Sequence, residues 1–180
     1  MTMIRVNTGA LRQPFRPCDP DFIRDVCQAR CCRSTTDPTG IAVVVTTAEA
    51  VRLRALGATV DPTTGRVAPV DRRCPFQGPD HLCTIHGPDE PLGCVVSPFT
   101  INANGTLIVR NRYRMLPCFK AEGAIPIAMA HRRSLEVLFG AEATELIVEA
   151  VRRDMVTSFW LEVPASIVDD LHHKNEASKA

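Results

Sequence analysis

Residues 21–32, with the sequence DFIRDVCQARCC, place three cysteines within six positions. Such a group of thiols decides how this part of the chain folds, because thiolates that hold a metal also fix the backbone that carries them. With an aspartate as N-cap, the stretch is predicted to form a short helix. On that helix Cys27 and Cys31 would share one face, and Cys32 would point about 100° further round. We therefore expect Cys27 and Cys31 to bind one metal, and Cys32 to bind a second metal or another edge of a cluster.

The chain has eight cysteines, and none of them follows residue 118. Eight thiols are enough for two four-thiolate sites or for one polynuclear cluster. Thiolate-rich ligation favours zinc or iron–sulfur over magnesium or calcium. The predicted metal ligands are Cys18, Cys27, Cys31, Cys32, Cys74, Cys83, Cys94 and Cys118.

Disulfides and scattered structural thiols are the alternatives to metal binding. The N-terminal segment has no unbroken apolar run of signal-peptide length, because arginines at positions 5, 12 and 16 interrupt it. This predicts a cytoplasmic location, where stable disulfides are rare. Metal binding is therefore the favoured interpretation.

Length and composition predict one α+β domain over residues 1–180. The chain is 45% hydrophobic and has a net charge of +1, which indicates neither a nucleic-acid nor a membrane partner. Its apolar runs, such as residues 41–45, are too short to cross a bilayer. We expect an irregular, metal-stapled β region over residues 18–120 and a helical region over residues 121–175.

Local sequence patterns predict a strand, a turn and a helix between the two groups of cysteines. Residues 41–45 are predicted to form a strand after a turn at residues 37–40. A capping box at Thr46 and Glu49 predicts a helix to Leu56 that buries its apolar side chains. Those side chains are Val51, Leu53 and Leu56.

A hairpin is predicted between the last two cysteines. Residues 95–101 and 106–110 flank an Asn102–Gly105 turn that suits positive φ angles. Because a hairpin brings its ends together, we expect Cys94 and Cys118 to ligate the same metal or cluster.

The C-terminal third has helical periodicity. One helix is expected from Pro126 to Gly140, a longer one over residues 142–160, and a short one from Pro164 to Leu171. These helices are interpreted as a scaffold packed over the metal region, with an intermolecular surface as the alternative.

The cysteine pattern resembles the YkgJ-like cysteine-cluster family of zinc- or iron-chelating domains. The resemblance covers residues 18–120, and Glu90-Pro91 stands where the family has Arg-Pro. It implies a chelating domain and no single reaction. The residues that carry it are Cys27-x3-Cys31-Cys32-Arg33, Cys74-Pro75-Phe76, Cys83-Thr84-Ile85-His86, Cys94 and Pro98-Phe99.

Metal identity stays open between an iron–sulfur cluster and zinc. Zinc sites prefer Cys-x2–4-Cys spacings, of which Cys27-x3-Cys31 is one near-example. Iron–sulfur clusters accept irregular spacings, often with a proline beside a ligand, as in Cys74-Pro75 and Pro117-Cys118. His86 has ligand-like spacing from Cys83, although eight thiols do not require it.

Three functions are compatible with this pattern. The favoured one is a non-catalytic metal-binding module that engages a protein partner. The alternatives are an iron–sulfur-dependent enzyme or redox protein, and a zinc-stabilised nucleic-acid-binding protein. No catalytic sequence motif assigns a reaction, so enzyme status is open. The nucleic-acid alternative depends on Arg110, Arg112 and Arg114, which are expected to line one face of a strand.

Overall fold

The computed structural model describes residues 1–33 and 43–168 and divides the chain into two compact units. Of the described residues, unit 1 holds 1–18 and 95–168, and unit 2 holds 19–33 and 43–94. Helices combine with two-stranded antiparallel sheets, which confirms the α+β class. The units divide the chain at residues 18 and 94, so they do not coincide with the expected regions 18–120 and 121–175.

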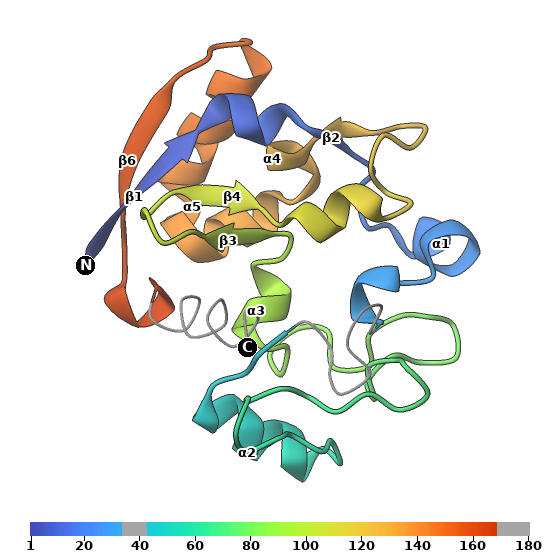
Figure 1. The fold of residues 1–180 in the computed structure, drawn as a ribbon. Coiled ribbons are helices and arrows are strands. Elements are labelled where there is room, and N and C mark those ends of the chain that lie inside the picture. The colour runs from blue at the N-terminus through green and yellow to red at the C-terminus, as the bar shows by residue number, and fades with distance from the viewer. Residues whose placement is uncertain (34–42, 169–180) are drawn as a thin grey trace. The chain divides into compact units, whose positions relative to one another are not determined.

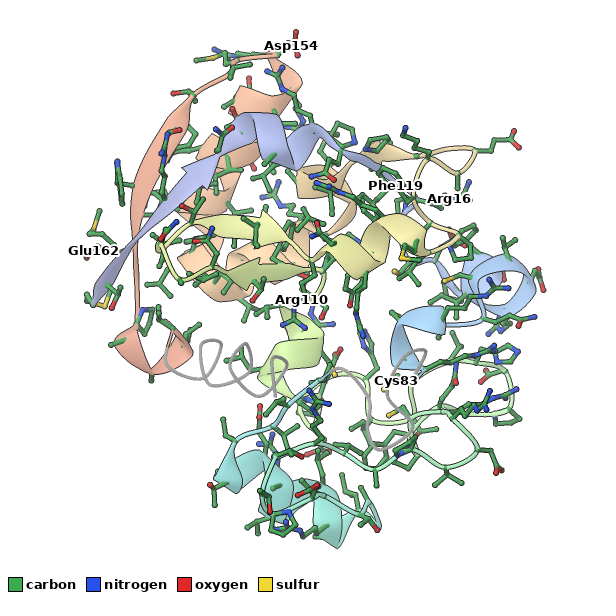
Figure 2. The ribbon with its side chains drawn as sticks, in the orientation of Figure 1. Arg16, Cys83, Arg110, Phe119, Asp154 and Glu162 are labelled. Carbon is green, nitrogen blue, oxygen red and sulfur yellow. The ribbon has the colours of Figure 1, made fainter. Side chains whose placement is uncertain are left out.

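Unit 1 begins and ends with paired strands. β1 (Thr2–Asn7) runs antiparallel to β6 (Ser158–Val163), from the Thr2–Val163 pair to the Asn7–Ser158 pair (Figure 1). Side chains alternate between the two faces. Ile4 and Val6 are fully buried, whereas Trp160 is 60% exposed, and Glu162 points outward from β6 (Figure 2). The expected helix over residues 142–160 is therefore wrong beyond residue 152.

The predicted hairpin is confirmed in unit 1, with shorter strands than expected. β3 (Phe99–Ile101) pairs with β4 (Leu107–Val109). In the turn, Asn102 Oδ1 accepts hydrogen bonds from the Asn104 and Thr106 backbone N–H groups. Gly105 has a φ of 66°, which glycine adopts without steric cost.

The three arginines after β4 do not line one face of a strand. Residues Asn111–Met115 form a 3-10 helix, η4, with three residues per turn. The Arg112 guanidinium lies 5.2 Å from the Tyr113 ring centroid, and Arg114 Nε donates to Gln13 Oε1 at 2.8 Å. The expected row of Arg110, Arg112 and Arg114 is thus corrected, and with it the geometry behind the nucleic-acid alternative.

The main helix of unit 1, α5 (Arg132–Arg152), is bent at Gly140, where φ is 79° and ψ is 169°. The predicted helix stop at Gly140 is confirmed as this bend. Arg132 on the first half forms a 2.7 Å ion pair with Glu145 on the second. The remaining elements of unit 1 are η1 (Thr8–Arg12), β2 (Pro14–Phe15), β5 (Ile125–Pro126) and α4 (Ile127–Ala130). Strands β5 and β6 therefore interrupt what was expected to be an all-helical region.

After β6, residues 165–168 are helical, and the rest of the helix expected from Pro164 to Leu171 lies outside the described residues. None of the described helices combines the length and apolarity that crossing a bilayer would require.

His131, between α4 and α5, makes the stability of unit 1 sensitive to acid. Its ring contacts Phe15 and Phe99 edge-on, at centroid distances of 6.5 and 6.4 Å. Burial among these groups lowers the pKa of His131 from 6.5 to about 4.

Because the folded pKa lies below the unfolded pKa, this contribution to stability is present above pH 6.5 and is lost as the pH falls through about 4. The loss at pH 4.5 should be about 2.5 kcal/mol. The free energy of unfolding of the wild type and of His131→Gln is measured by urea denaturation above pH 6.5 and at pH 4.5. The variant should lose less stability between the two conditions than the wild type. Equal losses in the two proteins would contradict this assignment.

Unit 2 consists mostly of loops around one regular helix, α2 (Thr47–Ala55). The predicted capping box is present, because Thr46 Oγ1 accepts from Glu49 N–H and Glu49 Oε2 accepts from Thr46 N–H. Leu53 is buried as expected. Val51 and Leu56 are 63% and 47% exposed, so the expectation that they are buried is wrong.

The other helical segments of unit 2 are short. α3 (Leu92–Val95) spans the point where the chain passes from unit 2 to unit 1. Residues 43–45 form only an isolated bridge from Val44 to Arg66, so the described part of the expected strand 41–45 is not a strand. The turn expected at residues 37–40 lies outside the described residues. The remaining short helices are α1 (Pro20–Phe22), the π-helix η2 (Ile23–Cys27) and the 3-10 helix η3 (Arg30–Cys32).

Candidate metal centre

The structure places six of the eight cysteines in unit 2 and joins none of the eight in a disulfide. Cys18 is exposed and Cys118 is buried, and both belong to unit 1. The expected sharing of a site by Cys94 and Cys118 therefore involves two different units and stays a prediction. The six cysteines of unit 2 are Cys27, Cys31, Cys32, Cys74, Cys83 and Cys94.

The first three thiols do not lie on one continuous helix. η2 ends at Cys27, and Gln28 and Ala29 then take left-handed backbone conformations, with φ angles of 52° and 45°. Cys31 and Cys32 follow on η3. The predicted stacking of Cys27 and Cys31 on one helical face is wrong, because two left-handed residues break the helix between them.

Cys31 and Cys32 are adjacent in sequence and close in space. Their Sγ atoms are 3.9 Å apart. The backbone of this pair is joined to the later cysteine loop, since Cys74 N–H donates to the Cys32 carbonyl at 2.9 Å. Two cysteine segments about 40 residues apart in sequence thus lie side by side within unit 2.

Three thiols accept hydrogen bonds from backbone N–H groups just after them. Cys74 Sγ accepts from Phe76 N–H, and Cys83 Sγ (Figure 2) accepts from Ile85 N–H, in each case two residues along the chain. Cys27 Sγ accepts from the N–H groups of the next segment, at Ala29 and Arg30. A hydrogen bond to sulfur favours the thiolate, which is the form that binds metal. These turns therefore suit the cysteines to ligation.

Electrostatic interactions link the six thiols of unit 2 into one neighbourhood. Burial first, and then the nearby charges of Cys74, Glu90, Cys83 and Cys31, raise the pKa of Cys94 far above its usual value. The Cys32 pKa is also raised, first by its hydrogen bond with Cys31 and then by burial. Thiols that oppose one another's ionisation in this way become thiolates when a cation joins them, because the cation's positive charge offsets their repulsion.

The core of unit 2 and one buried carboxylate position the last of these thiols. Cys74 and Cys94 pack against the cluster of buried residues. Glu49 is 8% exposed, and its Oε1 accepts from Leu92 N–H at 2.7 Å. Glu49 thereby ties the N-terminus of α2 to α3, which carries Cys94. The buried cluster is Val43, Val45, Ala50, Leu53, Ala58, Val60, Val67 and Phe76.

Backbone strain accumulates beside these cysteines. Gln28 and Ala29 precede Cys31, and Asp71 and Arg72, with φ angles of 49° and 63°, precede Cys74. His81, with a φ of 67°, precedes Cys83. Left-handed conformations cost non-glycine residues about 1–2 kcal/mol each, and they cluster where the surrounding structure must hold a particular geometry.

The strain at Ala29 gives a testable consequence. Ala29→Gly should stabilise unit 2 by about 1 kcal/mol, because glycine adopts a φ of 45° without a steric penalty. Ala55→Gly in α2 is the matched control and should destabilise by about 1 kcal/mol. Urea denaturation followed by circular dichroism measures both. Destabilisation by Ala29→Gly would show that the left-handed conformation is not maintained in solution.

Two histidines, His81 and His86, flank Cys83 in the sequence. His86 Nδ1 is 2.9 Å from Glu90 Oε2, so one ring nitrogen of the histidine already has a carboxylate partner. His81 Nδ1 is buried and has no hydrogen-bond partner among the described residues. Neither arrangement adds a histidine to the ligand set.

The donor atoms suit a thiophilic metal, although their present spacing is not that of a ligand shell. Within residues 1–33 and 43–168, no three His, Cys, Asp or Glu side chains stand at ligating distance from a common point. Soft thiolate donors with N–H···S hydrogen bonds are the set that zinc and iron–sulfur clusters use. The residues therefore fit such a group in their chemistry.

Comparisons of the chain with protein-family models, with curated proteins and with solved structures found no match.

Sequence reasoning identified the cysteines but missed the groups that position them. The backbone donors Phe76 and Ile85 are the third residues of Cys-Pro-Phe and Cys-Thr-Ile, so the residue two places after each cysteine was the available signal. Glu49 was recognised only as a capping residue, and its second bond, to Leu92, had no signal in the sequence.

Proposed function

We propose that this protein is a metal-binding module in which cysteine thiolates of unit 2 hold an iron–sulfur cluster or zinc. The observation that carries the proposal is the gathering of mutually interacting thiols, three of which already accept hydrogen bonds from the second backbone N–H after them. The resemblance to the YkgJ-like cysteine-cluster family supports the same function. The proposed ligands are Cys31, Cys32, Cys74, Cys83 and Cys94, with Cys27 at the margin of the group.

Metal binding explains the paired cysteines better than a disulfide does. Adjacent Cα atoms are about 3.8 Å apart, which is shorter than the roughly 4.4 Å minimum of ordinary disulfides. A bond between Cys31 and Cys32 would therefore be strained. Two neighbouring thiolates can instead bind one cluster or bridge two metal ions without that constraint.

The bound group would serve mainly to hold unit 2 in one conformation. Unit 2 joins a small apolar core to several loops that lack regular hydrogen-bonded structure. In a domain of this kind, metal-binding energy contributes directly to folding. The stabilised loops would then be available to a protein partner.

Elemental analysis of protein purified without oxygen tests the proposal. Stoichiometric iron or zinc is expected, together with protection of the unit 2 thiols from alkylation. An absorption band near about 400 nm that bleaches with dithionite would identify an iron–sulfur cluster, and its absence with bound zinc would identify a zinc site. Less than about 0.2 metal per chain, with all thiols freely titratable, would be incompatible with a resident metal.

The expected pairing of Cys94 with Cys118 has its own test. If both ligate one metal, Cys94→Ser and Cys118→Ser should each lose metal to a similar extent, and the double variant should lose little more. Elemental analysis of the three variants gives the result. Additive losses, or retention of metal by Cys118→Ser alone, would restrict the site to unit 2.

A further inference from the structure

Unit 2 has a shallow hollow beside Cys74 that the proposed metal function does not use. Its volume is about 430 Å³. It combines a cationic side chain, a carboxylate and a carboxamide at its surface. The lining residues are Val70, Asp71, Arg73, Cys74, Pro75 and Gln77.

Arg73 lies directly opposite Arg33 across an antiparallel bridge. The hydrogen bond from Cys74 N–H to the Cys32 carbonyl flanks this pair, so Arg33 and Arg73 form a non-hydrogen-bonded pair. In such pairs the Cα atoms are about 4.5 Å apart and both side chains leave the same face. The Arg33 and Arg73 side chains therefore leave the same face of the bridge, and Arg73 lines the hollow.

This arrangement starts two cationic side chains from opposite positions on one face of the bridge. Among the residues that the structure describes, no ion pair involves Arg33 or Arg73. Arg33 donates to Gln28 Oε1 at 3.2 Å, but its Nε is buried and has no hydrogen-bond partner in the described part of the chain. Like charges directly opposite one another destabilise a strand pair, and a bound anion would remove that cost.

A tight turn holds Arg73 in place. Val70 and Arg73 exchange two backbone hydrogen bonds of 2.9 Å, and both residues between them have positive φ angles. These are the features of a type I′ turn, which strongly restricts the backbone. Asp71, within the turn, adds a carboxylate to the rim of the hollow. An anion that also presents an O–H donor matches two guanidinium groups and one carboxylate.

We propose that Arg33 and Arg73 bind phosphate, as the inorganic ion or as a phosphate monoester, with Asp71 accepting a hydrogen bond from a protonated phosphate oxygen. Guanidinium groups bind phosphate through paired N–H···O bonds. The phosphate contacts come from residues other than the proposed metal ligands, and binding is measured on metal-loaded protein. Failure of phosphate binding can therefore be separated from failure of the proposed metal function.

Titration calorimetry of the purified full-length protein with inorganic phosphate, in a low-chloride buffer, tests this proposal. One saturable site is expected. Arg33→Gln and Arg73→Gln should each weaken phosphate binding about tenfold or more, because each removes charge-assisted hydrogen bonds. Arg52→Gln on α2, a charge change elsewhere in unit 2, is the matched control and should bind like the wild type.

Specificity supplies a second readout. Sulfate has no proton to donate at neutral pH, so the wild type should prefer phosphate, and Asp71→Asn should reduce that preference. Arg73→Lys keeps the charge but loses the paired donors, so it should bind phosphate with intermediate affinity. Metal content and circular dichroism are measured on every variant to confirm that it is folded and metal-loaded. No saturable phosphate binding, equal weakening in Arg52→Gln, or binding of an oligonucleotide but not of phosphate would each overturn the proposal.

Discussion

Cys74→Ser is expected to weaken metal binding by at least about 100-fold, equivalent to about 2.7 kcal/mol. Cys74 is central to the proposed site because its thiol accepts a hydrogen bond from Phe76 N–H and interacts electrostatically with Cys83 and Cys31. Its backbone is also bonded to Cys32. A serine hydroxyl is a poor ligand for a thiophilic metal. Competition with a chromogenic chelator measures the change in affinity.

A matched variant separates ligand loss from general destabilisation. Val67 is 1% exposed in the core of unit 2 and has no ligating atom. Val67→Ala should destabilise unit 2 by about 2 kcal/mol through the cavity it leaves, while the metal stoichiometry stays unchanged. If Cys74→Ser and Val67→Ala have equal effects on metal affinity, Cys74 is not a ligand.

Removal of the metal is expected to unfold unit 2 and to leave unit 1 folded. Metal binding contributes about 10–16 kcal/mol to the folding of small structural zinc domains, more than the total stability of many domains. The described part of unit 2 has one regular helix, α2, and a small apolar core. Unit 1 instead has paired strands and a 21-residue helix, neither of which contains a cysteine.

Hydrogen exchange before and after chelation measures this difference directly. Amides of α2 should lose protection, while those of β1 and β6 should keep it. The single tryptophan, Trp160, lies on β6, so its fluorescence reports on unit 1 alone and should change little on chelation. Unchanged exchange throughout unit 2 after complete metal removal would contradict a structural role for the metal.

The sequence predicted elements whose signals are local. The capping box of Thr46 and Glu49, the hairpin around Gly105 and the interruption at Gly140 depend on side chains and φ preferences within a few residues. The α+β class followed from the same signals. The cysteine positions likewise predicted which loops could bind a metal.

Elements that depend on distant partners were not predicted correctly. β1 pairs with β6, which lies more than 150 residues later in the chain. The apolar residues of β6 continue the helical pattern of the preceding segment, although the helix itself ends at Arg152. The buried face of α2 was predicted wrongly because, within the described residues, Val51 and Leu56 remain exposed, which periodicity alone does not reveal. The left-handed pair Gln28–Ala29 contains no glycine, so the break between Cys27 and Cys31 had no sequence signal.

X-ray absorption spectroscopy at the metal edge tests the proposed metal–thiolate centre most directly. Protein purified without oxygen should show a sulfur-dominated first shell, with metal–sulfur distances near about 2.3 Å for zinc or for an iron–sulfur cluster. In Cys74→Ser the sulfur contribution to this shell should fall. A first shell made only of nitrogen or oxygen ligands, near about 2.0–2.1 Å, would contradict the proposal that cysteines of unit 2 hold the metal.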